Sequence, residues 1–191
     1  MNIFLCSDLH IGHKGMTTFT RDDGTPQRPW ATVEEHDEAL IANWNSVVRP
    51  KDKVYNLGDV VINRKAFPTL VRLNGTKVLI KGNHDLFRIE EYLPYFKDVR
   101  ACHPLDGFMM SHIPIHPASL SRWTGNIHGH LHHNEVSTET HYKVASFGKQ
   151  DTVIENTLDT RYMCVSMEHI DYTPISWDEA KKKFEERKHG E

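Results

Sequence analysis

The sequence predicts a domain of mixed α and β structure, and three observations support this fold class. With 191 residues, the chain is long enough to bury a core as one domain, or at most as two small ones. Its apolar segments have the length of β-strands, and most of them end in polar residues or glycine. Two further segments combine helical spacing of apolar residues with capping residues. Strands and helices therefore follow one another along the chain.

The N-terminal part begins with a buried strand at residues 2–7, which runs into the polar sequence DLHIGH. A loop rich in Gly, Thr, Asp and Pro follows at residues 13–30. Residues 32–48 predict a helix, because Thr32 and Glu35 form a capping-box pattern at its start. The apolar residues near one face of this helix are Val33, Leu40, Ile41, Trp44, Val47 and Val48.

The middle of the chain predicts two more strands with a helix between them. Residues 53–59 form the first of these strands, which ends in Gly-Asp. The next segment is expected to become helical after Pro68 and to close at Gly75. Residues 76–85 then form an apolar strand that ends in the polar turn GNHD.

The C-terminal part predicts short strands followed by a solvent-facing helix. The expected strands span residues 108–114, 125–133, 142–148 and 161–170. The final helix covers residues 176–188, where Ser176 and Glu179 form a second capping-box pattern.

Polar residues suited to ligand binding follow the apolar strands in sequence. They are Asp8, His10, Asp59, Asn83, His84, Asp85, His112, His130 and His132. Ligand sites in open α/β sheets lie beyond the carboxyl ends of the strands, so separate strands would deliver these groups to one rim. Imidazole and carboxylate ligands without thiolates favour manganese, iron, zinc, nickel or cobalt over calcium.

Composition and charge exclude several other classes of protein. The chain contains three widely separated cysteines and no CxxC pair, so neither a disulfide framework nor a zinc ribbon is expected. There is no signal-peptide pattern and no apolar stretch of membrane-spanning length. The formal net charge is -3, which provides no global attraction for nucleic acid. We therefore expect a cytoplasmic protein with no membrane partner.

In chain order, the strand-end motifs are DLH at 8–10, GD at 58–59, GNHD at 82–85, His112, and GHLH at 129–132. Together they resemble the signature of the calcineurin-like metallophosphoesterases, and the resemblance runs from residue 2 to about residue 165. The sequences HIGHKGM, LNGTKVLIKGNHD and SHIPIHP are similar to those of small bacterial and phage members of the family.

This resemblance implies an α+β fold, a four-layer αββα sandwich of two mixed β-sheets flanked by helices. It also implies a single metallophosphoesterase domain over residues 1–191. One departure from the family pattern is the sequence LGDVVINR, which lacks the GDxVDRG motif of the protein phosphatases. A protein phosphatase activity is therefore not expected.

The resemblance implies two divalent metal ions, with Mn²⁺ expected first and Fe, Zn, Ni or Co as alternatives. The first ion would take Asp8, His10, Asp59 and His132, and the second would take Asp59, Asn83, His112 and His130. A carboxylate can bridge two ions, which fits Asp59 after the tight turn at Gly58. In the motifs DLH and HLH, the alternation of an extended chain would point both side chains to one side.

The resemblance also implies a reaction, in which metal-activated hydroxide attacks a phosphoester. His84 would contact the phosphate and protonate the leaving oxygen, and Asp85 would orient His84. Four further histidines flank the motifs without matching a family position and are interpreted as neighbours or surface residues: His13, His116, His128 and His133. Five more are interpreted as ordinary: His36, His103, His141, His169 and His189.

Residues 13–30 directly follow the first ligand pair and are expected to lie beside the site. One interpretation is a solvated loop, and the other is a lid that contacts substrate. As a lid, the loop would use Arg21 and Arg28 as substrate-binding residues that meet phosphate oxygens, while Phe19 and Trp30 could stack on a base.

Three functions remain open on the sequence. The favoured one is hydrolysis of small phosphoesters, such as nucleotide or cyclic nucleotide diesters. The second is a nuclease acting on DNA or RNA, which would want a basic track or a stacking platform. The third is a non-catalytic metal-binding scaffold, which a complete ligand set disfavours. Long nucleic acid is thus not the expected partner, and the oligomeric state is left open.

Overall fold

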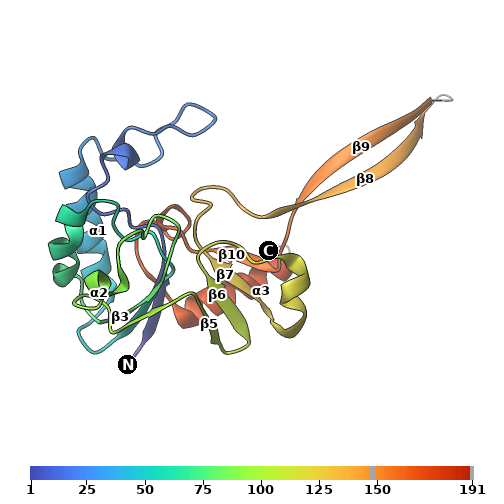
Figure 1. Ribbon diagram of the computed structural model, residues 1–191. Helices are drawn as coiled ribbons and strands as arrows, with labels where there is room; N and C mark the ends of the chain where they lie inside the picture. Colours follow the sequence, from blue (N-terminus) through green and yellow to red (C-terminus); the bar gives the residue numbers. More distant parts are fainter. Residues whose placement is uncertain (147–148, 190–191) are drawn as a thin grey trace.

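Two mixed β-sheets form the centre of the computed structural model, which describes residues 1–146 and 149–189 (Figure 1). The first sheet has the order β11-β1-β2-β3-β4, and only β11 runs antiparallel to its neighbour. Its strands are β1 (Ile3–Cys6), β2 (Lys53–Asn56), β3 (Thr76–Ile80), β4 (Asp98–Arg100) and β11 (Ile175–Ser176). The second sheet has the order β10-β7-β6-β5, and only β5 is antiparallel. Its strands are β5 (Cys102–Leu105), β6 (Phe108–Ser111), β7 (Gly125–His128) and β10 (Tyr162–Cys164).

Helices flank the two sheets, which together with the mixed sheets confirms the predicted α+β architecture (Figure 1). The α-helices are α1 (Val33–Val47), α2 (Ile89–Tyr92) and α3 (Trp177–His189). The 3₁₀ segments are η1 (Lys14–Thr17), η2 (Arg64–Arg72), η3 (Pro117–Arg122) and η4 (Met167–His169). The predicted capping box of α1 is formed, with the Glu35 amide donating to the Thr32 hydroxyl over 3.1 Å. In α3, Phe184 packs edge-to-face on Phe108 of the second sheet, at 4.9 Å between ring centres.

The segment around Pro68 differs from its prediction. It is a 3₁₀ helix that begins at Arg64, before the proline, and ends at Arg72. Asn63 starts it early, because its side chain accepts a hydrogen bond of 3.0 Å from the Lys65 amide. In this nine-residue 3₁₀ segment the hydrogen bonds run from residue i to residue i−3, so Pro68 interrupts no i→i−4 ladder.

A long hairpin was only partly predicted. Strands β8 (Ser137–Ser146) and β9 (Lys149–Leu158) pair along their full length and project from the body (Figure 1). The predicted strand at 142–148 overlaps β8, and its last two residues lie outside the described part of the chain. Strands are predicted from alternating apolar residues, which form a buried face. The residues at the base of this hairpin are exposed and show little of this pattern, so the hairpin was only partly predicted.

The two sheets share one core and bring their strand ends together. Leu5 and Val78 from the first sheet belong to the same buried apolar cluster as Met110 and Ile127 from the second. The parallel direction of β1, β2 and β3 places their carboxyl ends at one edge, as it does for β6, β7 and β10. A parallel bridge from Ser7 to Ser166 links these two edges. Across residues 1–146 and 149–189, no helix combines the length and apolar character needed to cross a membrane.

Candidate metal centre

The loops at this common edge have an unusual backbone conformation. Among the described non-glycine residues with positive φ are five of the predicted ligands: Asp8, His10, Asp59, His130 and His132, at φ 59°, 51°, 56°, 73° and 51°. The expectation that DLH and HLH are extended is therefore wrong. In each motif both outer residues are left-handed, which turns the chain sharply and presents neighbouring side chains to one point. Such conformations cost of order 1–3 kcal/mol each and cluster at functional sites.

Asp8, His10 and His132 form a first group of potential ligands. One nitrogen or oxygen atom from each lies within 4.8 Å of the others, although the residues come from the ends of β1 and β7. The rings of His10 and His132 stack at 5.2 Å between centres. The other carboxylate oxygen of Asp8 is held by the Ser166 hydroxyl at 2.7 Å and by the His130 amide at 2.9 Å. The carboxylate is thus fixed with one oxygen directed at the group.

Asp59, His112 and His130 form a second group within the same 4.8 Å limit. His112 donates from Nδ1 to the carbonyl oxygen of Leu57 over 2.6 Å, which directs Nε2 toward the group. The Oδ1 atom of Asn83 lies 2.8 Å from this Nε2, so Asn83 is next to the second group.

Asp59 lies between the two groups. Its Oδ2 is 3.8 Å from Nε2 of His10 in the first group and 3.4 Å from Nε2 of His112 in the second. Its Oδ1 accepts a hydrogen bond of 2.8 Å from the His84 amide. The turn that presents Asp59 requires glycine at position 58, where φ is 102° and a Cβ would stand 2.7 Å from the Gly82 backbone. A single carboxylate oxygen thus faces ligand nitrogens of both groups.

The donor set fits two divalent cations. Among the described residues, the buried Oδ1 of Asp8 and both ring nitrogens of buried His10 have no hydrogen-bond partner. Buried polar atoms in native proteins are almost always satisfied, so the unpaired Asp8 Oδ1 and His10 Nε2, which lie 3.8 Å apart, indicate a ligand. Carboxylate oxygen, amide oxygen and imidazole nitrogen are all first-row metal donors. His10 delivers a neutral nitrogen, because burial and the nearby Arg28 charge hold its pKa well below the ordinary value.

Glu168 is a functional residue that the sequence interpretation missed. It lies in η4, just after β10, and its buried carboxylate accepts a hydrogen bond of 3.0 Å from Nδ1 of His132. Burial alone would raise the pKa of Glu168, but Arg28 and His132 hold it well below the ordinary value. The rule that located the other site residues, a polar group just past a strand, applies to Glu168 as well.

His84 is exposed at the site, whereas its neighbour Asp85 is buried. The ring centre of His84 is 5.8 Å from that of His10. The Asp85 carboxylate accepts hydrogen bonds from the amides of Asp59, Val60 and Gly82 at 2.8–3.1 Å. The expectation that Asp85 orients His84 is not supported by this geometry. Asp85 instead ties the loop of Asp59 to the loop that carries Asn83 and His84.

The expectation that Arg21 and Arg28 bind substrate also needs correction. Arg28 is 1% exposed and lies beneath the first group, where its guanidinium binds Glu168 and backbone carbonyls. Arg21 is half-buried beside Tyr172 and is not among the residues that line the cavity at the site. No local pattern indicates that Arg28 is buried, because its carboxylate partner Glu168 lies 140 residues away in the sequence.

The remaining histidines divide into wall residues and structural residues. His13 and His133 line the cavity beside the ligands. His128 is buried and donates to the Gly129 carbonyl over 2.8 Å, and burial lowers its pKa to about 4. His116 accepts a hydrogen bond from the Ala118 amide at the start of η3. None of these four residues belongs to the two ligand groups found among the described residues.

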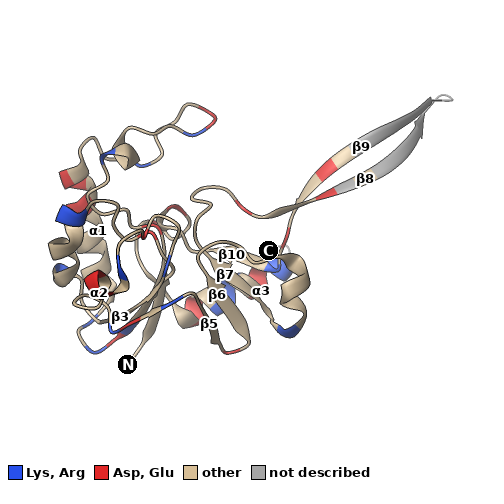
Figure 2. Cartoon of the chain, in the orientation of Figure 1, with Lys and Arg blue, Asp and Glu red and all other residues tan. Residues whose placement is uncertain are grey.

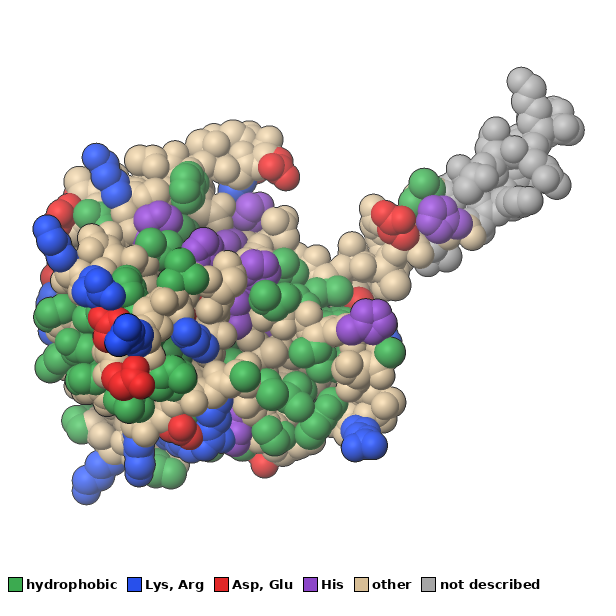
Figure 3. All heavy atoms as spheres, viewed as in Figure 1, with side chains coloured by type: hydrophobic (Ala, Val, Ile, Leu, Met, Phe, Trp, Pro, Cys, Tyr) green, Lys and Arg blue, Asp and Glu red, His purple; other side chains and the backbone are tan. Residues whose placement is uncertain are grey.

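A cavity of about 600 Å³ opens over the ligand groups. Its floor includes His10, His84, His130 and His132, and its apolar wall consists of Met16, Phe19, Ile62 and Leu131. Figure 3 shows histidine side chains gathered on this face beneath the projecting N-terminal loop and toward the base of the hairpin. The loop at 13–30 therefore supplies a wall of the cavity through η1 and Phe19.

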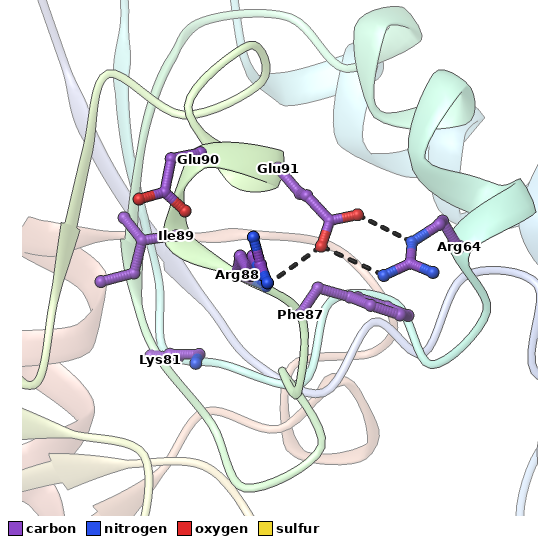
Figure 4. Close-up of a pocket in the computed structure, with 7 residues that line it drawn as sticks. All are labelled: Arg64, Lys81, Phe87, Arg88, Ile89, Glu90 and Glu91. Atoms are coloured by element: carbon purple, nitrogen blue, oxygen red, sulfur yellow. Dashed lines mark hydrogen bonds and ion pairs between the residues drawn. The ribbon is translucent and has the colours of Figure 1, made fainter.

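A second, more open cleft lies next to the His84 loop, lined by Arg64, Lys81 and residues 87–91 (Figure 4). Glu91 is the centre of its polar contacts. It binds the Arg64 guanidinium at 2.7 Å and accepts from the Arg88 amide at 3.1 Å. The cleft therefore carries charges of both signs.

With this geometry established, comparison with known proteins identifies the family: the chain belongs to the calcineurin-like phosphoesterases, whose family model matches residues 1–185. Membership implies phosphoester hydrolysis in general.

Uncharacterized protein MJ1445 of Methanocaldococcus jannaschii is 34% identical over 194 residues, covering 97% of this chain and 93% of that protein. Gene 66 protein of Mycobacterium phage L5 is 38% identical over 91 residues, covering 44% of this chain and 40% of that protein. The solved structure of AQ665, a protein of unknown function from Aquifex aeolicus, has a similar fold, with a TM-score of 0.62 and 23% identity. That alignment covers 95% of this chain and 98% of AQ665.

Metal affinity is expected to fall in acid. Burial alone would lower the pKa of His112 and of His132, but Asp59 and Glu168 raise them above the ordinary 6.5. A protonated ring cannot bind a metal, so each ion must displace a proton below these values. We expect Mn²⁺ affinity to fall by about tenfold per pH unit below the raised pKa values, as one displaced proton per site requires. Titration with Mn²⁺ at stepped pH measures this slope, and a flat profile down to about pH 5 would contradict it.

In the metal-free protein, the ion pairs of His112 and His132 are expected to contribute stability in the opposite direction. A group whose pKa is higher in the folded than in the unfolded protein stabilises the fold. This stabilisation is complete at pH values below the pKa of the unfolded protein and is lost as the pH rises through the pKa of the folded protein. The pairs His112–Asp59 and His132–Glu168 therefore stabilise the metal-free fold most at mildly acid pH. Melting curves recorded with and without metal over the same pH series separate the two effects.

Proposed function

We propose that this protein is a metal-dependent hydrolase of small phosphodiesters, such as nucleotide or cyclic nucleotide diesters, with a dinuclear centre. The observation that carries the proposal is the position of Asp59, whose Oδ2 faces His10 on one side and His112 on the other, at 3.8 and 3.4 Å. A carboxylate shared by two ligand groups can hold two cations close together, as two-metal catalysis of phosphoester hydrolysis requires.

The geometry supports the following assignment of residues to the two ions. Asp8, His10, His132 and Asp59 would hold one ion, and Asp59, Asn83, His112 and His130 would hold the other. When bound, such ions supply a nucleophile at neutral pH and stabilise the charge that develops on phosphorus oxygens. We propose manganese first, and iron, zinc, nickel or cobalt as alternatives, because the donors are imidazole and oxygen without thiolate.

His84 is the proposed proton donor to the leaving oxygen. It is exposed at the cavity floor, so its imidazole can reach a bound phosphoester. Its backbone is fixed by the hydrogen bond from its amide to Asp59. A proton delivered from this position stabilises the departing alkoxide, a contribution of about 10²–10⁴ in rate for a positioned acid.

The cavity favours a small substrate. Its volume of about 600 Å³ is in the range of sites for single small molecules. The apolar wall formed by Met16, Phe19, Ile62 and Leu131 offers a surface for a base or an aryl group. Among the residues lining it in the described part of the chain there is no lysine or arginine, so the anionic group would depend on the bound metals for its charge balance.

A nuclease acting on long DNA or RNA is the weaker candidate. Figure 2 shows basic and acidic residues interspersed over the described body instead of gathered in a basic track. The open cleft next to His84 pairs Arg64 with Glu91 and also includes Glu90 (Figure 4). A polyanion would meet acidic side chains along that path.

The proposed compartment is the cytoplasm. Cys6 and Cys164 are buried, free thiols, and burial raises the pKa of the Cys164 thiol to about 12. Protonated, buried thiols behave as small core residues in a reducing environment.

A matrix of metals and substrates tests the proposed function. The metal-stripped protein is reloaded with Mn²⁺, Zn²⁺ or Ni²⁺ and assayed with bis-p-nitrophenyl phosphate, p-nitrophenyl phosphate, cyclic nucleotides, and linear duplex and single-stranded DNA. We expect metal-dependent turnover of the small diesters and little cleavage of DNA. Rapid degradation of DNA with slow turnover of small diesters would favour the nuclease instead.

A further inference from the structure

Arg28 and Glu168 are buried, are not among the residues that line the cavity at the site, and are joined directly beneath the first ligand group. The Arg28 Nε donates to Glu168 Oε1 over 2.9 Å, and both side chains are at most 1% exposed. Burying two charges is costly, and such a pair is often no more stable than apolar residues of the same size. We therefore looked for a function of this buried ion pair other than stabilising the fold.

Arg28 holds the backbone of the loop that carries the first two ligands. It donates to the carbonyl oxygen of Asp8 at 2.5 Å and to that of Leu9 at 3.0 Å. Asp8 and His10 on this loop are both left-handed, a conformation that persists only when surrounding contacts enforce it. The hydrogen bonds from the Arg28 guanidinium to the carbonyl oxygens of Asp8 and Leu9 are contacts of this kind.

Glu168 holds the third member of the same group. Its Oε1, the atom that accepts from Arg28, also accepts from Nδ1 of His132 at 3.0 Å. This contact fixes the tautomer and the ring orientation of His132, so that Nε2 faces the ligand group. The two residues thus reach all parts of the first group: Asp8 and His10 through the backbone, and His132 through its ring.

The second ligand group is supported mainly by other contacts, and its direct link to Asp8 is the hydrogen bond from the His130 amide. Its His112 is oriented by the Leu57 carbonyl, and the Asp59 loop is held by Asp85. The hydrogen bonds of Arg28 and Glu168 go to Leu9, Asp8, His36, His132 and Gln27. None of these belongs to the second group.

We propose that Arg28 and Glu168 are positioning residues for one of the two metal sites, the one formed by Asp8, His10 and His132. The inference rests on the proposed metal centre, but it concerns only how the affinities of the two sites are set. Removing the pair should weaken the first site and leave the second nearly unchanged. Contacts of this kind around metal ligands are worth about 10–100-fold in metal affinity.

The test is a Mn²⁺ titration of the metal-stripped chain by calorimetry, which needs no substrate. In the wild type we expect two binding events. In Glu168→Gln, one event should weaken by about 10–100-fold while the other stays within about twofold. Because a lone buried Arg28 destabilises the fold, the paired variant Arg28→Gln with Glu168→Gln is measured beside it, and melting of the metal-free forms shows that both are folded.

The control is a matched pair on the surface. Arg72 and Glu38 form the same kind of ion pair, at 2.6 Å, with both side chains at least half exposed. Glu38→Gln should leave both Mn²⁺ affinities unchanged. A double-mutant cycle then identifies the affected site, with asparagine at the two left-handed histidine positions. With His132→Asn, the Glu168→Gln change should have little further effect, and with His130→Asn it should keep its full effect.

Equal weakening of both sites, or unchanged affinities in the folded paired variant, would overturn the inference. The proposed function is judged separately, by turnover of small diesters in the wild type. A wild-type protein that hydrolyses these diesters while Glu168→Gln binds both ions normally would retain the function and exclude the positioning role. A wild type that binds fewer than two ions would overturn both.

Discussion

Asp59→Asn is expected to abolish hydrolysis and to weaken both metal sites together. The carboxylate oxygen that faces both His10 and His112 would be replaced by an uncharged amide group, which cannot bridge two cations. Loss of several kcal/mol of metal-mediated stabilisation corresponds to at least about a 10³-fold fall in kcat/KM. Metal content after dialysis and kcat/KM on bis-p-nitrophenyl phosphate are the two measurements.

The matched control for this change is Asp178→Asn, an exposed carboxylate on α3. It carries the same chemical change and should leave metal content and turnover at wild-type values. If Asp59→Asn lost one ion and kept the other at normal affinity, Asp59 would be a ligand of one site only.

His84→Ala is expected to keep both metals and to lose turnover. The His84 side chain lies outside both ligand groups, while its amide, which the substitution retains, supports Asp59. On a substrate with a poor leaving group, kcat should fall by about 10²–10⁴, the range for a positioned acid. With p-nitrophenolate as leaving group the fall should be smaller, because that group departs with little protonation.

The comparison between the two leaving groups distinguishes proton donation from a general disturbance of the site. His141→Ala, on the projecting hairpin, is the matched histidine control and should affect neither substrate. An equal loss on both substrates would show that His84 binds the phosphate without donating a proton.

Prediction from the sequence succeeded where the signal was local. The end of a strand is recognised in the sequence by a change from apolar to polar residues. Asp8, Asp59 and His130 could therefore be assigned to strand ends without a structure. The capping box of Thr32 and Glu35 is equally local, and it is formed. Parallel strands then bring such ends together, which is why residues far apart in the sequence form two ligand groups.

Prediction failed where a side chain depends on a distant partner. Arg28 resembled a loop cation, but its partner Glu168 lies 140 residues away, and only the fold brings the two together. Asp85 stands beside His84 in sequence, yet its carboxylate serves three backbone amides of neighbouring loops. The direction in which a loop side chain points depends on contacts with residues that are distant in the sequence, so residue type and local spacing do not predict it.

The left-handed backbone at Asp8, His10, Asp59, His130 and His132 has a consequence for any mutational study of this centre. Alanine at these positions removes a ligand and also leaves a residue that tolerates positive φ poorly, so two losses are measured as one. Asparagine accepts the same backbone more readily and changes mainly the donor atom. For transfer of this centre to another scaffold, the loop conformations must be transplanted with the side chains, because the direction of each ligand is set by its own φ and ψ.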